Sequence, residues 1–247
     1  MFDSGILLTE QGIWVVIALF YVFDNVKQLQ GSKLIFRETW KFGWKAALPS
    51  EALVLLNRQF VLLPVLLPYV LTVEMRWLTE NPHDPSQVRR ADRLLRVARH
   101  KAFSLRCIST IAFLAFFVAG PALTYWRGLL FALLEVAPVY VGMLLMFVLS
   151  ALFDRRFWGL RFTEIIYAVV EAAICPAYLV NITHRLCWRC IRIDVDGAAY
   201  GLLRCSPSSV NQFRSTIGFA LEELEQKFAE NPTQKAHLQE YSKSVLG

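Results

Sequence analysis

The sequence predicts an all-α, polytopic integral membrane protein with about three full transmembrane helices. Hydrophobic residues make up 55% of the 247 residues, and the mean hydropathy is +0.41; soluble domains are about 45–50% apolar. The apolar residues gather in blocks, several of them long enough to cross hydrocarbon as a helix of roughly 20 residues, and cations gather between the blocks. The blocks cover residues 5–23, 52–73, 107–125, 128–153 and 163–183.

The first block, 5–23, is expected to be a retained transmembrane helix with an external N-terminus. The residues before it carry Asp3 and no cation, whereas a cleavable signal peptide begins with positive charge. No small-residue cleavage site follows Phe23. This block therefore stays in the protein as a membrane anchor.

The cations predict sidedness, because short loops rich in Lys and Arg stay cytoplasmic. Four segments hold 20 of the 26 Lys and Arg residues. If all five blocks crossed, the first two of these segments would lie on opposite faces of the membrane. Both are cytoplasmic if block 52–73 enters and returns. The four segments are 27–45, 76–106, 153–162 and 184–206.

Blocks 52–73 and 163–183 are therefore expected to be re-entrant or kinked segments. Pro64 and Pro68 lie in the first block, and Pro176 lies in the second. Proline lacks an N–H and clashes with the preceding turn, so a helix kinks or breaks there. Arg58 would then sit at headgroup depth with its aliphatic stem in the apolar layer. A Pro-kinked helix that crosses completely is the alternative for both blocks.

Blocks 107–125 and 128–153 predict a tight helical hairpin with an external turn at "TYWRG". Before this hairpin, residues 86–103 predict a basic amphipathic helix. Its apolar stripe recurs at spacings of three and four, and it consists of Val88, Ala91, Leu95, Ala98 and Ala102. Its lipid-facing cations are expected to be Arg89, Arg90, Arg93, Arg96 and Arg99.

This helix is expected to lie on the anionic inner leaflet, where each cation contributes about 1 kcal/mol. The alternative is a connector that packs on a partner subunit. Nucleic acid is not an expected partner, because no aromatic side chains are interleaved with the arginines.

The domain organisation predicted is a membrane domain over 1–190 and a cytoplasmic helical tail over 191–247. Within the tail, residues 208–230 carry an apolar stripe, and "NP" at 231–232 ends that helix before a shorter one. Such a hairpin has too little core to be stable alone. It should pack on the membrane body or on a partner protein. The stripe consists of Val210, Phe213, Ile217, Leu221, Leu224 and Phe228.

The candidate metal ligands are His184, Cys187, Cys190 and Cys205, which would supply a sulfur-rich zinc site. The signal is weak, because a zinc site usually has two separated ligand pairs and only one CxxC is present. The alternatives are ordinary cysteines, or a redox or acylated thiol. No cofactor is otherwise expected.

The intramembrane polar candidates are Arg58, Glu135 and Glu171, because ionisable groups in apolar segments are costly and often functional. The two glutamates predict either a proton or substrate path, or hydrogen bonds to another helix or subunit. Pairing with Arg58 or Arg127 would lower their burial cost.

The function expected is that of a non-catalytic accessory subunit of an assembly in the bacterial inner (plasma) membrane. The basic loops and the amphipathic tail helix would dock partner subunits. No phosphate-cradling glycine loop and no hydrolase motif is present. Two alternatives stay open: a small transporter or channel-like subunit that uses Glu135 and Glu171, and an enzyme acting on a lipid-linked substrate, with interfacial arginines binding phosphate.

Overall fold

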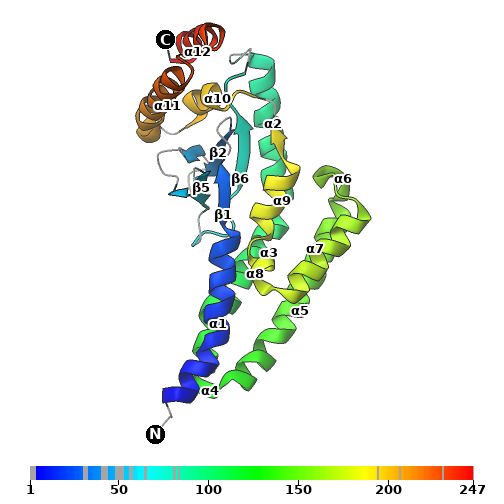
Figure 1. Cartoon of the computed structure of the whole chain (residues 1–247). Coiled ribbons are helices and arrows are strands. Elements are labelled where there is room, and N and C mark those ends of the chain that lie inside the picture. Colours follow the sequence, from blue (N-terminus) through cyan, green and yellow to red (C-terminus); the bar gives the residue numbers. More distant parts are fainter. Residues whose placement is uncertain are drawn as a thin grey trace. The chain divides into compact units, whose positions relative to one another are not determined.

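A computed structural model of the chain shows two compact units, each described here by itself (Figure 1). Unit 1 comprises Met1–Val26, Leu63–Val70 and Arg99–Cys190, and unit 2 comprises Lys27–Leu62, Leu71–Ala98 and Ile191–Gly247. The residues that the structure describes are 4–29, 33–39, 44–47, 53–55, 58–63, 66–79, 82, 84–193, 195–205, 207–229 and 231–246.

The unit boundaries differ from the predicted division at residue 190. The C-terminal segment clusters with residues 27–62 and 71–98, which the sequence assigns to the membrane domain. The third segment of unit 2 is distant in the sequence from the other two, and charge and hydropathy along the chain do not report such a grouping.

Unit 1 is built mainly from helices, in agreement with the long apolar blocks. The segments α3, η2 and α4 follow one another without interruption, and η2 is a π-helical turn. The elements are α1 (Ser4–Asp24), α3 (Phe103–Leu114), η2 (Ala115–Ala119), α4 (Gly120–Arg127), α5 (Leu129–Phe153), α6 (Arg155–Trp158), α7 (Phe162–Ile174), α8 (Pro176–Val180) and α9 (Ile182–Cys190).

The helical hairpin predicted over 107–125 and 128–153 is confirmed. Gly128 alone separates α4 from α5, and its φ of +85° is a conformation that glycine adopts without strain. The π-helical turn η2 lies directly before Pro121, whose missing N–H removes one hydrogen bond of a regular helix.

Helix α1 runs antiparallel to the α3–α4 segment. The indole Nε1 of Trp14 donates to Thr124 Oγ1 over 2.8 Å, and the ring centroids of Tyr21 and Phe117 are 5.0 Å apart. Gly120 allows the close approach, because a Cβ there would lie 2.4 Å from the Trp14 ring. The N-terminal half of α1 therefore lies beside α4, near the Gly128 turn.

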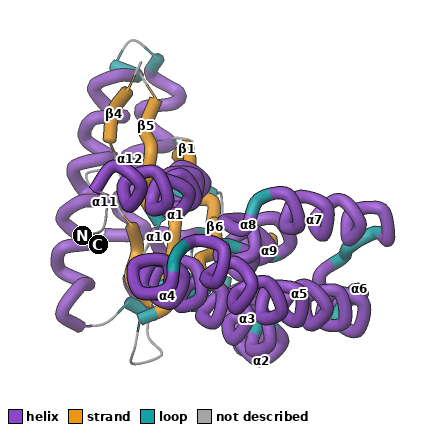
Figure 2. The backbone as a smooth tube through the Cα atoms, turned by 90° about the horizontal axis from the view of Figure 1, so that it is seen from below, coloured by secondary structure: helices purple, strands orange, loops and turns teal. Residues whose placement is uncertain are grey.

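The segment from α7 to α9 runs along α5 and then turns back (Figures 1 and 2). Tyr140, midway along α5, donates its hydroxyl to the carbonyl of Ala172 near the end of α7. The helix then breaks at Cys175, Pro176 begins α8, and α9 begins after Asn181. The hydroxyls of Thr183 and Ser109 are 2.8 Å apart. The break predicted at the proline is therefore present, and α9 returns to the first turns of α3.

Unit 2 contains β-sheets as well as helices, so the predicted all-α class is corrected to mostly helical with strands. One sheet has the order β3-β2-β6-β7, in which β2 pairs antiparallel with β3 and β6, and β6 pairs parallel with β7. The other has the order β1-β5-β4. The strands are β1 (Val26–Leu29), β2 (Lys33–Glu38), β3 (Trp44–Ala47), β4 (Leu53–Leu55), β5 (Arg58–Leu62), β6 (Thr72–Arg76) and β7 (Arg192–Ile193).

The predicted re-entrant segment 52–73 contributes to this correction, although β1, β2, β3 and β7 lie outside it. Its described residues form β4, β5, turns over 66–70 and the start of β6, and Asn57 and Pro64 lie outside the described residues. A short apolar run is compatible with a buried strand or with a helix, and periodicity alone does not separate the two. The turn that includes Pro68 divides this run into strand-length pieces.

The basic helix is present as α2 (Pro85–Lys101), and the predicted apolar stripe is its buried face. The helices of the C-terminal segment are α10 (Gly197–Arg204), α11 (Pro207–Lys227) and α12 (Pro232–Leu246). The middle of the α11 stripe is also buried, since Phe213, Ile217 and Leu221 are each at most 2% exposed, and its remaining members, Val210, Leu224 and Phe228, are half-buried. Phe213 packs on Phe36 of β2 and over Gly201 of α10, so the chain itself covers this stripe.

Candidate functional site

The first candidate site is the apolar surface of unit 1. Among the residues that the structure describes, two helices are long and apolar enough to cross a membrane: Phe103–Arg127 and Leu129–Phe153. The core helix of a soluble protein passes the same test, but it is mostly buried, whereas only 22% of the most apolar window of α5 is buried. The exposed apolar side chains of α5 include Leu130, Phe131, Leu134, Val141, Leu145, Met146, Leu149 and Phe153.

Glu135 forms an ion pair across the hairpin turn. Arg127 Nη1 donates to Glu135 Oε1 over 2.6 Å, and the side chains are 63% and 43% exposed, respectively. The predicted pairing with Arg127 is therefore present. Arg58, the other predicted partner, lies on β5 of unit 2 rather than in an apolar helix, and its side chain is outside the described part of the chain.

The opposite end of the hairpin is joined by a second ion pair. Lys101 Nζ lies 2.7 Å from Asp154 Oδ1, which links the residues before α3 to the residue after α5. Arg155 and Arg156 follow at once in α6. The hairpin thus has a neutralised pair at its turn and an accumulation of cations at its open end.

A polar network at the end of α1 was not expected from the sequence. Arg185 of α9 binds Asp24 with two hydrogen bonds: Nε to Oδ2 over 2.9 Å and Nη2 to Oδ1 over 2.5 Å. The side chain of Asp24 is only 11% exposed. A carboxylate at the C-terminal end of a helix is unfavourable beside the helix dipole, so the guanidinium compensates for both the dipole and the burial. In the sequence, Asp24 directly follows the apolar block 5–23, and an acid in that position indicates that a cationic partner is needed.

Two asparagines extend this network between α1 and α9. Asn181 Nδ2 donates to Asp24 Oδ2 over 2.8 Å, and Asn25 Nδ2 donates to Asn181 Oδ1 over 3.0 Å. Both asparagines are at most 1% exposed. They hold the turn between α8 and α9 against the end of α1, because buried amides need partners.

Glu171 is the remaining predicted intramembrane residue, and it belongs to the same network. Its Oε2 accepts from Arg185 Nη1 over 3.1 Å, and its side chain is 54% exposed. The Arg185 guanidinium also lies 3.7 Å from the centre of the Tyr178 ring. Arg185 therefore bridges α7 to α1, and the contact of Glu171 is with another helix of its own unit.

In unit 2, a buried carboxylate joins three segments. Asp196 is 1% exposed and caps α10, accepting from Ala199 N over 3.0 Å. Its Oδ2 also accepts from both the amide and the hydroxyl of Thr79, and its Oδ1 accepts from the Tyr241 hydroxyl over 2.7 Å. Burial and the nearby Asp196 raise the pKa of Tyr241 well above its usual range. The dipeptide Asp196–Gly197 is a recognisable helix start, but its distant partners are not.

A second acid fixes α2 to α10. Tyr200 donates its hydroxyl to Asp92 Oδ1 over 3.0 Å, and Arg204 donates to the other oxygen of Asp92. Burial, together with Asp92, raises the pKa of Tyr200 well above its usual range. The α2 helix is thus held in unit 2 by its apolar stripe and by this contact.

Most of the arginines of α2 face solvent. Four of the five predicted cations are exposed, and the fifth, Arg99, is half-buried; the exposed four are Arg89, Arg90, Arg93 and Arg96. Protein covers the apolar stripe, however, since Leu95 is 3% and Ala98 is 0% exposed. An amphipathic helix that lies on lipid needs its apolar face free. The prediction that the apolar stripe of α2 lies in the lipid boundary therefore has no support from the structure. The exposed arginines of α2 stay accessible.

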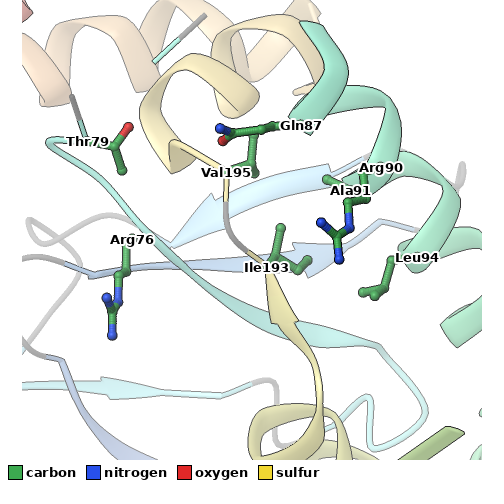
Figure 3. Close-up of a pocket in the computed structure, with 8 residues that line it drawn as sticks. All are labelled: Arg76, Thr79, Gln87, Arg90, Ala91, Leu94, Ile193 and Val195. Carbon is green, nitrogen blue, oxygen red and sulfur yellow. The ribbon is translucent and has the colours of Figure 1, made fainter. Parts of the chain in front are cut away.

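A cleft of about 360 Å³ opens in unit 2 beside α2 (Figure 3). Arg90 extends from α2 on one side, and Arg76 lies on the other, with Ile193 of β7 between them in this view. The remaining lining residues are Thr79, Gln87, Ala91, Leu94 and Val195. The cleft thus combines two cations with an apolar wall, and no pattern in the sequence indicates that these distant positions meet.

The predicted zinc ligands are not brought together. His184 and Cys187 are buried on α9, and Cys190 is half-buried at the end of that helix. Cys205 belongs to unit 2, where its backbone forms an isolated β-bridge with Trp44. Burial raises the pKa of the Cys205 thiol, which disfavours the thiolate that binds metal. Among the described residues, no group of three His, Cys, Asp or Glu side chains could hold a metal ion. The zinc prediction therefore has no support from this arrangement.

Comparison with protein-family models, with curated proteins and with solved structures finds no match. The functional assignment rests on the chain's own geometry.

Proposed function

We propose that this chain is a non-catalytic, integral accessory subunit of a multi-protein assembly in a bacterial inner membrane. The observation that carries the proposal is the hairpin of α3–α4 and α5. Its 25-residue α5 leaves most of its apolar surface without protein cover. Lipid chains can cover such an apolar surface without an unfavourable change in free energy. The backbone N–H and C=O groups of a helix hydrogen-bond to one another, so they need no water there.

The membrane part has three crossings and one re-entrant segment. The third crossing is α1, whose 21 residues extend about 30 Å and which packs along α4. Its exposed apolar side chains are Val15, Val16, Leu19, Phe20, Val22 and Phe23. The re-entrant segment is α7 to α9. The 13 residues of α7 extend only about 20 Å, and the segment returns to α3 through the contact of Thr183 with Ser109.

The open end of the hairpin is cytoplasmic. It carries Lys101, Arg155 and Arg156, whereas the cation at the turn, Arg127, is balanced by Glu135. A positive end stays inside. The start of α1 lies beside the turn and is therefore external. Unit 2 follows α1 and α9 in the chain without a further apolar span, so it is cytoplasmic together with the C-terminal tail.

Docking is assigned to the arginine stripe of α2, which we define as Arg89, Arg93 and Arg96. These side chains are exposed, and a row of cations on a rigid helix attracts an acidic partner surface and raises its rate of association. The α11 stripe, an earlier candidate, is occupied by the core of unit 2. Glu135 and Glu171 form ion pairs with Arg127 and Arg185, respectively, and these pairs account for both glutamates without a transport path.

Purification from native membranes in mild detergent tests this proposal. The expected result is recovery of partner proteins at a fixed stoichiometry. Replacing Arg89, Arg93 and Arg96 together by Glu should release them, because like charges across an interface repel. The matched control is Arg214→Glu, which removes an exposed cation from α11 of the same unit. A monodisperse wild-type chain without partners, or retention of partners by the triple variant, would contradict the proposal.

A further inference from the structure

The cleft beside α2 holds two cations that the rest of unit 2 leaves unbalanced. Among the described residues, neither Arg76 nor Arg90 forms an ion pair with a carboxylate. Three carboxylates that the structure describes in the neighbouring elements are engaged elsewhere: Glu74 lies 2.7 Å from Lys33 Nζ, Asp92 binds Arg204 and Tyr200, and Asp196 binds Thr79 and Tyr241. The described lining residues of the cleft thus include two cations and no acid.

The lining is suited to a ligand with a charged part and an apolar part. Arg76, Arg90 and Gln87 supply N–H donors, and guanidinium groups match the oxygens of phosphate. Ile193, Val195 and the neighbouring side chains of α2 supply apolar surface. A volume of about 360 Å³ falls within the roughly 300–1,000 Å³ of small-molecule sites. A bare phosphate ion would leave the apolar wall uncovered.

We propose that this cleft binds an organic phosphate, that is, a phosphate ester carrying an apolar substituent. The phosphate lies against the guanidinium group of Arg90 and the amide of Gln87, which both extend from α2, and Arg76 adds positive charge from the opposite side of the cleft (Figure 3). The substituent lies on Ile193 and Leu94. Two sources share this chemistry: the headgroup region of an anionic phospholipid and a soluble phosphate ester. The site is independent of the docking stripe, because neither cleft arginine belongs to it.

The test uses the full chain in detergent and phenyl phosphate as the probe, with binding measured by calorimetric titration. Wild-type protein should bind phenyl phosphate saturably and more tightly than inorganic phosphate or phenol. Arg90→Gln should weaken binding by about tenfold or more, because it removes charge-assisted hydrogen bonds to the phosphate. Arg76→Gln should weaken binding less, because it removes only an attraction across the cleft that salt screens. Leu94→Glu should abolish binding by placing a negative charge at the half-exposed wall of the cleft.

Arg214→Gln is the matched control, since it removes an exposed cation of unit 2 that does not line the cleft. Its affinity for phenyl phosphate should equal that of wild type. Equal affinities in the wild type, Arg76→Gln and Arg90→Gln would overturn the proposal, and so would absence of saturable binding to a wild-type chain that keeps its thermal transition.

Competition distinguishes the two sources. If nanodiscs that contain phosphatidic acid displace phenyl phosphate, and nanodiscs of phosphatidylcholine alone do not, the source is an anionic lipid. If neither displaces it and glycerol 3-phosphate does, the source is a soluble ester. Displacement only by a co-purified acidic protein would overturn the assignment to a small phosphate ester.

Discussion

Asp196 joins three segments of unit 2 through its hydrogen bonds, and Asp196→Ala measures how far the unit depends on it. The substitution removes the α10 cap, which contributes about 1 kcal/mol. It also strands the hydroxyls of Tyr241 and Thr79 and the Thr79 amide in a site where Asp196 is 1% exposed. A buried donor without an acceptor costs about 1–3 kcal/mol. We expect a total loss of about 4 kcal/mol.

Hydrogen exchange followed by mass spectrometry, on the full chain in detergent, measures this loss element by element. A loss of about 4 kcal/mol corresponds to an opening constant for α10 and α12 about a thousandfold larger. Peptides of α5 provide the internal reference, because they should exchange as in wild type. Tyr241→Phe should cost only about 1 kcal/mol, since Asp196 keeps its other donors.

Glu222→Ala is the matched control, because it removes an exposed acid from α11 of the same unit and should leave exchange unchanged. If Asp196→Ala left the exchange of α10 and α12 within a few-fold of wild type, the carboxylate would not hold these elements together, and the reasoning about unit 2 would be wrong.

Three further predictions concern other contacts. Arg185→Ala should destabilise unit 1 by about 3 kcal/mol, because it leaves Asp24 nearly buried without its cation. Adding Asp24→Asn should restore part of the lost stability, as measured by thermal melts. If the double variant restores none of it, the two residues are not coupled. Gly201→Ala should lower the stability of unit 2 by about 1–3 kcal/mol, because the new Cβ would lie 2.3 Å from the Phe213 ring. In the double variant, Phe213→Leu should reduce the cost of Gly201→Ala. If the two stability losses simply add, the clash is refuted. Titration of Tyr200 and Tyr241 should not reduce the stability of unit 2 below pH about 10, the usual tyrosine pKa. Stability should fall as the pH rises further, because the pKa values of both tyrosines are raised in the folded state and the unfolded chain releases these protons first. In a pH series of melts, the Tyr200→Phe/Tyr241→Phe variant should lose less stability over that range, and an equal loss would contradict this origin.

Long helices with a consistent pattern could be predicted from the sequence. The buried face of α2 consists of the residues with helical spacing, such as Val88 and Leu95, and the hairpin turn falls at Gly128. These features depend on neighbours three or four residues apart, which a sequence displays directly.

The short strands and the distant contacts could not be predicted in the same way. Residues 58–62 and 72–76 pair as strands with partners elsewhere in the chain, and an apolar run of that length fits either a strand or a buried helix. Arg185 and Asp24 are 161 positions apart. The cleft likewise combines Arg76, Arg90 and Ile193 from separate segments of unit 2. Only the folded chain brings such residues together.

Labelling of single added cysteines from each face of intact membranes tests the central claim most directly. Ser86→Cys lies at the exposed start of α2, and Tyr125→Cys lies beside the hairpin turn, where Tyr125 is 64% exposed; the parent protein corrects for labelling of the native cysteines. The account predicts that an impermeant maleimide added outside reacts with Tyr125→Cys, and with Ser86→Cys only after the membrane is opened. External labelling of Ser86→Cys in sealed cells, or equal labelling of both positions, would contradict it.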